Sequence, residues 1–167
     1  MQTLMMQVVK SDPINRRGLR RAEYGDLSLL HSFDCNTDAP LRDVLAVDVS
    51  AQYDRATGIV EIDLPSFIPH AALRYPDHAN NFRIVCEAAA LDFKDEVFNG
   101  VHTESASLPL NNLPTAPLHL QLSLAPNETR PVIVALTVQY REVVNGFEYA
   151  IINNTDCALN FVLVDNV

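Results

Sequence analysis

The chain has 167 residues, and 48% of them are hydrophobic, which suffices for one well-formed core in a single domain. No apolar run reaches the roughly 18 residues of a membrane-spanning helix, and the first residues lack the basic and apolar regions of a signal peptide, so we expect no membrane partner. Residues 1–21 hold five basic residues and one acidic residue (+4), whereas residues 22–167 hold seven basic and twenty acidic residues (−13), so the net charge of −9 is unevenly distributed.

The first 26 residues are predicted to form a strand and a basic arm. Residues 4–9 are mostly apolar and indicate a short strand. Residues 10–26 contain one proline, two glycines and no hydrophobic period, which is typical of an extended arm or loop. We therefore divide the chain into residues 1–26, with the N-terminal strand and the arm, and a β-sandwich domain over residues 27–167.

Strands and turns then alternate up to residue 65. Residues 27–33 read as a strand, residues 34–40 as a turn, and residues 41–53 as a second strand. Residues 54–58 form a hairpin loop that leads into a strand over 59–65. In this last strand Val60, Ile62 and Leu64 alternate with polar neighbours, which predicts a half-buried strand.

The middle of the chain contains a proline-rich loop. Residues 65–81 hold three prolines, and loops of this length in compact domains are usually functional or form interfaces, so Phe67 and Tyr75 are predicted interface residues. Further elements follow in order, namely a core strand over 82–93, a helical turn or loop over 94–100, a strand over 101–110, a linker over 111–117, a strand over 118–125 and a turn over 126–131.

The C-terminal residues 131–165 are predicted to contain a β-hairpin and a third strand. Asn145 and Gly146 suit a two-residue type I′ turn, because both tolerate a positive φ angle. A turn there pairs Val144 with Phe147, Glu142 with Tyr149, Tyr140 with Ile151 and Val138 with Asn153. It also gathers most of the apolar residues on one face, so the period-2 pattern and the turn agree. A short turn at 153–156 and a strand over 159–164 would complete a β-meander.

These elements predict the fold class. They amount to nine or ten short strands, separated by turns that are rich in proline, asparagine and aspartate. This spacing is typical of an all-β protein with a single antiparallel β-sandwich or jelly-roll-like domain.

The sequence contains no pattern that predicts catalysis, a cofactor or a metal. Asp34, Asn36 and Asp38 imitate the start of a calcium loop, but the sixth position is Ala39 instead of glycine and the twelfth is Leu45 instead of glutamate. His70 and His78 share the proline-rich loop without the spacing of zinc ligands. Nucleophile-elbow and phosphate-loop motifs are also missing, so we expect a protein that is not an enzyme and has no cofactor.

The cysteines indicate the compartment. Cys35, Cys86 and Cys157 are odd in number, widely spaced and without a CxxC motif, which predicts free, mostly buried thiols in a reducing environment. We therefore expect a cytoplasmic protein.

The arginines of the arm, Arg16, Arg17, Arg20 and Arg21, allow three interpretations. They could bind an acidic protein surface, bind nucleic acid, or be an inert solvated loop. The charge of −13 on the rest of the chain would repel a polyanion, and no aromatic residues lie between the arginines, so a nucleic acid partner is disfavoured. The nearest acidic protein surface is another copy of the chain, and arginine makes the bidentate carboxylate contacts that such an interface needs.

Three segments resemble an uncharacterised bacterial family. They are residues 33–45, with an F-x-x-N turn at Phe33, residues 60–84, with a P-x-F-x-P loop, and residues 139–164, with a VNG-x-x-Y hairpin. The family has no assigned function, so the resemblance implies one all-β domain and no activity, ligand or catalytic residue.

Two functions of different classes remain. The first is a non-enzymatic structural protein that self-assembles into an oligomer or filament through the basic arm on an acidic body. The second is a ligand-binding sandwich of the carbohydrate type, for which Tyr24, Tyr53 and Tyr75 are the candidate aromatic residues and the absence of tryptophan is unfavourable.

Overall fold

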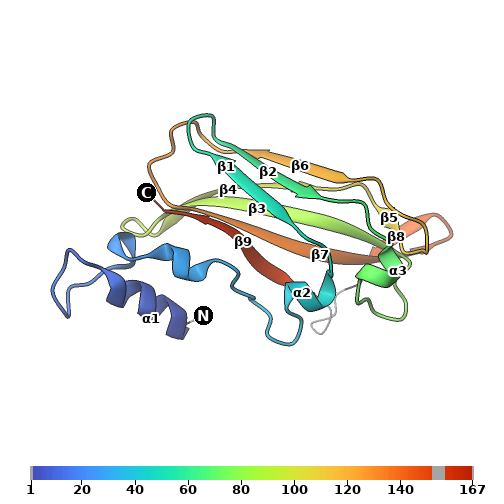
Figure 1. Cartoon of the computed structure of the whole chain (residues 1–167), viewed down its shortest axis with the longest axis horizontal. Helices are drawn as coiled ribbons and strands as arrows, with labels where there is room; N and C mark the ends of the chain where they lie inside the picture. Colours follow the sequence, from blue (N-terminus) through green and yellow to red (C-terminus); the bar gives the residue numbers. More distant parts are fainter. Residues whose placement is uncertain (1, 152–156, 167) are drawn as a thin grey trace.

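The computed structural model describes residues 2–151 and 157–166 and confirms the predicted all-β sandwich. Two antiparallel sheets pack face to face, and short helices lie at the ends and on one outer face (Figure 1). The predicted turn at 153–156 and the pairing of Val138 with Asn153 lie outside the described residues.

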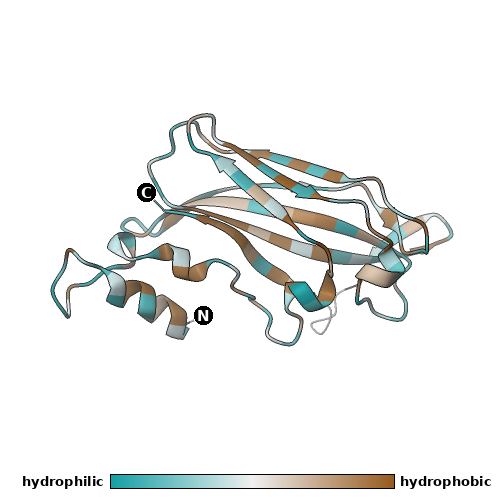
Figure 2. Cartoon of the chain, viewed as in Figure 1, coloured by the Kyte–Doolittle hydropathy of each residue, from teal (hydrophilic) through white to brown (hydrophobic). Residues whose placement is uncertain are grey.

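The larger sheet forms the base of the sandwich, with β4, β3, β7 and β8 in that order, β5 on β3 and β9 on β7. Its strands are β3 (Asn81–Asp92), β4 (Val97–Glu104), β5 (Leu108–Pro109), β7 (Val132–Val144), β8 (Phe147–Ala150) and β9 (Leu159–Asp165). The central pair, β3 and β7, contains many apolar residues (Figure 2), and alternate side chains of both strands are buried in the core.

The smaller sheet has the order β1-β2-β6 and is polar on its outer face. Its strands are β1 (Ser50–Asp54), β2 (Ile59–Leu64) and β6 (Leu118–Ser123). Ile62 and Leu120 point inward, whereas Asp63 and His119 lie outside, so the alternation predicted for β2 and β6 is confirmed. Gly58 is required in the turn before β2, since its φ angle is +77° and a Cβ atom there would lie 2.4 Å from the carbonyl oxygen of Leu124.

The core lies between the two sheets. Its largest fully buried side chains come from both layers, and they include Tyr140, Phe82, Ile84 and Leu136 from the large sheet and Ile62 and Leu64 from the small sheet. Phe67 packs on Phe82 with ring centroids 5.9 Å apart. This apolar layer supplies most of the favourable free energy of folding.

The predicted N-terminal strand over 4–9 is wrong, because these residues belong to helix α1 (Gln2–Ser11). Leu4, Met5 and Val8 follow helical spacing, and Val8 is fully buried. The strand predicted over 27–33 is also wrong, since Leu27–Leu30 forms the 3-10 helix η2. Its Leu27 and Leu30 lie three residues apart on one side of the turn and are both buried.

A second core joins these helices to the outer face of the large sheet. Val8, Leu27 and Leu30 pack on Ile133 of β7, and Phe161 of β9 lies beside them. The short 3-10 turn η1 (Ala22–Tyr24) connects the two helices. The large sheet is therefore covered on both faces at this end of the molecule (Figure 1).

Three other boundaries differ from the prediction. The strand predicted over 41–53 begins only at Ser50, because residues 41–44 form the helical turn α2 (Leu41–Val44) after Pro40. The loop over 65–81 contains the helical turn α3 (Pro69–Ala72). The helical turn or loop predicted over 94–100 is mostly strand, since β4 starts at Val97 and pairs with β3.

The C-terminal strands do not form a meander. β8 pairs with the last residues of β7, and β9 pairs with the first half of β7 on the same side. Both strands thus share one edge of β7 instead of pairing with each other. The sequence pattern could not reveal this arrangement, because the choice of partner depends on where the chain returns after residue 151.

Candidate interaction surfaces

The first surface is the end of the β7–β8 hairpin. The predicted register is confirmed, with Val144 opposite Phe147 and Glu142 opposite Tyr149. Both turn residues have positive φ angles, +52° at Asn145 and +82° at Gly146, as a type I′ turn requires.

The apolar face of this hairpin is not buried at its end. Val144, Phe147 and Tyr149 are 43%, 68% and 57% exposed, whereas Tyr140 on the same face is buried. The hairpin projects past the small sheet, so no second layer covers its last residues (Figure 1). The apolar face predicted for the hairpin is therefore buried only in its inner half. We call Val144, Phe147 and Tyr149 the hairpin face.

The β7 strand of the hairpin is held by the loop before β3. The side chain of Asn80 donates to the Val143 carbonyl at 3.0 Å and accepts from the Val143 N–H at 2.7 Å. The Tyr140 hydroxyl donates to the Arg74 carbonyl at 2.6 Å. These bonds fix the direction in which the hairpin face is presented.

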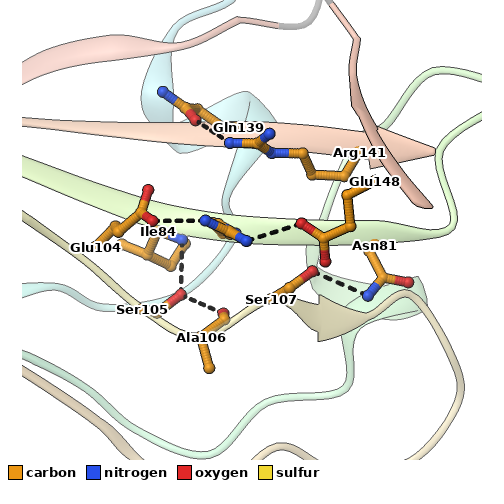
Figure 3. Close-up of polar contacts among 10 residues, drawn as sticks. Asn81, Ile84, Glu104, Ser105, Ala106, Ser107, Gln139, Arg141 and Glu148 are labelled. Atoms are coloured by element: carbon orange, nitrogen blue, oxygen red, sulfur yellow. Dashed lines mark hydrogen bonds and ion pairs between the residues drawn. The ribbon is translucent and has the colours of Figure 1, made fainter. Parts of the chain in front are cut away.

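The opposite face of the hairpin joins a network of charged residues. The guanidinium of Arg83 donates to Glu104 at 2.5 Å and to Glu148 at 2.7 Å. In Figure 3 these are the dashed lines that end at the labelled Glu104 and Glu148. A hydrogen bond from Ser107 and the positive charge of Arg83 hold the pKa of Glu148 below its ordinary value. The network keeps this face of the hairpin polar.

The second surface is an apolar groove at the other end of the large sheet. It has a volume of about 400 Å³ and lies between Met5 of α1, Leu30 of η2 and the outer face of β3, β7 and β9. Its lining on the sheet consists of Glu87, Ala89, Leu91, Phe93, Ile133, Ala135, Leu159 and Phe161. Glu87 is the only charged residue of that lining.

The third surface is the basic loop, residues 12–21. The predicted extended arm is wrong in its conformation, because the carboxylate of Asp12 accepts hydrogen bonds from the N–H groups of Ile14, Asn15 and Arg21 and folds the loop onto α1. Burial opposes ionisation of Asp12, but these hydrogen bonds outweigh it and hold its pKa well below the usual range. The loop is thus a fixed part of its own subunit.

The four arginines of this loop have different surroundings. Arg20 donates to the carbonyl of Lys10 at 2.8 Å, and Arg21 lies 3.5 Å from a carboxylate oxygen of Glu23. Arg16 and Arg17 are exposed and form no ion pair with any residue that the structure describes. Contact between this loop and a neighbouring subunit stays a prediction. It now applies to a loop that is fixed on its own subunit.

Of the two interface residues predicted in the proline-rich loop, Phe67 is buried, whereas an interface role for Tyr75 stays a prediction. Phe67 belongs to the core, where it cannot reach a neighbouring molecule in this conformation. Tyr75 is half-buried and stacks on His70 with ring centroids 5.5 Å apart. Because Phe67 faces the gap between the sheets, the loop serves to close one end of the sandwich.

The other residues that the sequence singled out do not form one site. They are Asp34 of the calcium-like turn and the tyrosines considered for carbohydrate binding. Asp34 accepts hydrogen bonds from the Leu41 N–H and the Asn160 side chain, as a turn residue does. Tyr53 borders a cavity on the small sheet, while Tyr24 borders another at the basic loop.

Within residues 2–151 and 157–166, no group of three or more His, Cys, Asp or Glu residues is placed to hold a metal ion. Over the same residues, no helix is long and apolar enough to cross a bilayer.

Sequence reasoning missed the groove entirely. Its floor is made by Ala89 and Ala135, small residues on neighbouring strands that leave space under α1. Ala89 in the predicted strand over 82–93 is the available signal, but the apolar run over 4–9 predicts a strand and so gives no helix beside it.

Comparisons with known proteins give little similarity. No known protein family matches the chain, and no curated protein matches it either. One solved structure, described as "pH-induced modulation of Streptococcus parasanguinis adhesion by Fap1 fimbriae", aligns with 69% of this chain and 80% of its own at 10% identity and a TM-score of 0.31. An alignment at that TM-score supports no conclusion about this chain.

Proposed function

We propose that this chain is a non-enzymatic structural module that self-associates into an oligomer or filament. The observation that carries the proposal is the hairpin face, where three large apolar side chains are exposed at the end of the β7–β8 hairpin. Soluble monomers rarely expose contiguous apolar patches of this kind unless the patch meets a partner. Aromatic residues are also enriched at the centre of protein interfaces.

The surroundings of the hairpin face suit an interface. The bonds from Asn80 and Tyr140 hold the ribbon in place, so little conformational entropy would be lost on binding. Charged groups lie around it, with Glu142 on the same face and the Arg83–Glu148 pair behind it. An apolar centre with a polar rim is the usual composition of an interface.

The unequal charge distribution adds a weaker argument. Arg16 and Arg17 remain on the surface of a chain with a net charge of −9, so two copies attract each other where the loop of one meets an acidic region of the other. Such contacts between exposed charges are screened by salt, so they would guide association more than hold it.

We place this function in the reducing cytoplasm. The support is that Cys35, Cys86 and Cys157 are all free thiols. Only Cys86 is buried, so the prediction of mostly buried thiols is wrong. Burial raises the pKa of the Cys86 thiol to about 12, so this cysteine is an inert core residue.

Light scattering coupled to gel filtration tests the proposal. We expect the wild-type chain to form species larger than one chain as its concentration rises. The double variant Phe147→Ser, Tyr149→Ser should stay monomeric, because it loses the apolar anchors. Leu113→Ser is the matched control, since Leu113 is 69% exposed in the loop between β5 and β6 and lies outside the hairpin.

Two results would contradict the proposal. One is a wild-type chain that remains monomeric at every concentration. The other is a Phe147→Ser, Tyr149→Ser variant that associates as the wild type does. The charge contribution is tested separately with Arg16→Glu, Arg17→Glu, which should weaken association at low salt and have little effect at high salt.

A further inference from the structure

We infer that strand β8 pairs with β8 of a second copy, antiparallel and across a two-fold axis. This inference rests on the proposed self-association and specifies its contact. The large sheets of the two copies become one continuous sheet, and the two hairpin faces lie side by side on it. Addition of a strand to an open sheet edge is a common mode of association, in which the backbone supplies the hydrogen bonds.

The backbone of β8 has free hydrogen-bonding groups at the edge of the large sheet. The Ile151 N–H donates to the Tyr140 carbonyl at 3.0 Å, so residues 147, 149 and 151 direct their N–H and C=O groups towards β7. The corresponding groups of Glu148 and Ala150 point away from β7, and no residue in the described part of the chain bonds to them. An open edge of this kind is a template for another strand.

The next strand along the same edge of β7 is protected. Residues 32–35 lie along β9, where the Ser32 N–H donates to the Phe161 carbonyl at 2.8 Å and the Cys35 N–H donates to the Leu159 carbonyl at 2.7 Å. Strand β8 has no such cover among residues 2–151 and 157–166, and its sequence contains neither the lysine nor the proline that often blocks an edge. A second copy can therefore add its strand at β8.

Hydrogen-bond geometry and charge select one register. When Glu148 lies opposite Ala150 of the second copy, both residues of each copy exchange backbone hydrogen bonds. A slip of two residues places either Glu148 or Ala150 opposite its own counterpart, and the other residue then has no partner within β8. The slip that pairs Glu148 with itself also opposes two carboxylates, which destabilises a sheet.

This register also pairs the apolar side chains. Tyr149 lies opposite Tyr149 of the second copy, and Phe147 lies opposite Ile151, all on the side of the sheet that carries the hairpin face. Aromatic pairs and pairs of an aromatic with a β-branched residue stabilise neighbouring strands. Glu142 lies on the same side, but the two Glu142 residues are about 15 Å apart, which is beyond the Debye length at physiological salt.

The polar side of the sheet supplies complementary charges. Arg141 lies opposite Ala150 and donates to Gln139 at 3.3 Å, as Figure 3 shows. Its Nε is buried without an acceptor, and no carboxylate of the described residues forms an ion pair with it. The proposed register places Glu148 of the second copy directly beyond Ala150. The Cα atoms of Arg141 and this Glu148 are then about 10 Å apart, a distance that the two long side chains span across the small alanine.

The resulting row of charges alternates in sign. Glu148 keeps its ion pair with Arg83 of its own copy, and Arg83 is also bonded to Glu104. Each Glu148 thus lies between Arg83 of its own copy and Arg141 of the other. Arg141 attracts the Glu148 of its own copy as well, but forms no ion pair with it.

The symmetry limits the assembly formed by this contact. Both copies use the same strand, so the contact closes at a dimer. Residues 147–151 of each copy make a small interface, and we therefore expect a dimer that dissociates on dilution.

Proline at position 150 tests the strand pairing. The N–H of Ala150 points outward, so Ala150→Pro removes no hydrogen bond within the chain but blocks a second strand. The variant should be monomeric by light scattering at concentrations where the wild type is dimeric. The matched control is His102→Pro in β4, the other edge strand of the large sheet. Its N–H also points outward, because the Ser105 N–H donates to Ile84 of β3 and directions alternate along the strand. This control should dimerise as the wild type does.

Cysteine cross-linking tests the register in a Cys35→Ser, Cys157→Ser background. Tyr149→Cys should form a disulfide between two copies under mild oxidation, since the Cα atoms of residues 149 face each other at about 4.5 Å. Phe147→Cys is the control, because residue 147 is similarly exposed but lies more than about 13 Å from its counterpart in this register. Thermal melting of every variant shows that it is folded.

The results separate this inference from the proposed function. If Phe147→Ser, Tyr149→Ser associates as the wild type does, both are wrong. If that variant is monomeric but Ala150→Pro still associates, or if His102→Pro abolishes association as well, only the pairing of β8 strands is wrong. A Phe147→Cys chain that cross-links as readily as Tyr149→Cys, or a Tyr149→Cys chain that does not cross-link, would also overturn the pairing in this register.

Discussion

The carboxylate of Asp12 accepts a hydrogen bond of 2.9 Å from the backbone N–H of Arg21, nine residues later in the chain. The same carboxylate binds the N–H groups of Ile14 and Asn15. One acidic side chain therefore closes a loop that holds most of the positive charge of the N-terminal region. This arrangement turns a segment with the composition of a flexible arm into a fixed surface.

Replacement of Asp12 by alanine should loosen the basic loop. The N–H groups of Ile14, Asn15 and Arg21 lose their acceptor, so their hydrogen exchange should become several-fold faster. Amide exchange measured by NMR checks this, with the amide of Val134 in β7 as the internal control. Unchanged exchange at the three loop amides would show that other contacts close the loop.

The helices at the start of the chain should contribute to global stability. Leu30 is buried against β7 and β9, so Leu30→Ala should lower the free energy of unfolding by about 2–4 kcal/mol. The neighbouring Leu29 is 40% exposed, so Leu29→Ala should change the free energy of unfolding by no more than about 0.5 kcal/mol. Urea denaturation measures both variants. Equal effects would mean that η2 does not pack on the sheet as described.

The hydroxyl of Tyr140 should stabilise the root of the hairpin. Tyr140→Phe removes the 2.6 Å hydrogen bond to the Arg74 carbonyl and should cost about 1–2 kcal/mol in the free energy of unfolding. Tyr149→Phe is the control, because Tyr149 is exposed and its loss of a hydroxyl should leave the stability nearly unchanged. Urea denaturation at neutral pH compares the two. If Tyr140→Phe leaves the free energy of unfolding unchanged, the hydrogen bond to the Arg74 carbonyl makes no net contribution to stability.

Glu128 should make the fold sensitive to acid. The hydrogen-bonded guanidinium of Arg130 lowers the pKa of this carboxyl from 4.5 to about 2. A lowered pKa in the folded state stabilises the protein above the ordinary pKa, and this contribution is lost as the pH falls from about 4.5 towards about 2. The Tm of the wild type should therefore drop over that interval.

Glu128→Gln tests this assignment. The variant should have a lower Tm at neutral pH and a smaller decrease in acid than the wild type, since the titrating group is gone. Asp95→Asn, which removes an exposed carboxyl, is the control. If the acid-induced decrease in Tm is the same in Glu128→Gln as in the wild type, other carboxyls cause it.

The hairpin and the sheet-forming segments were predictable from the sequence because local rules determine them. Asn145-Gly146 specifies the turn, and the turn sets the register of β7 and β8. The alternation in β2 and β6 likewise predicts which residues face the core. These signals depend on neighbours along the chain, so no knowledge of tertiary packing is needed.

Only the tertiary structure decided how the two ends of the molecule are built. Residues 4–9 are apolar in a way that suits a strand as well as a helix, and contact of Val8 with Leu27, Leu30 and Ile133 selects the helix. The apolar groove brings Met5 of that helix together with Ala89 and Ala135, which are 46 residues apart in sequence. The exposure of Phe147 depends on where the small sheet ends. Each of these features arises from contacts between distant segments, and a local hydrophobic pattern contains no information about distance in space.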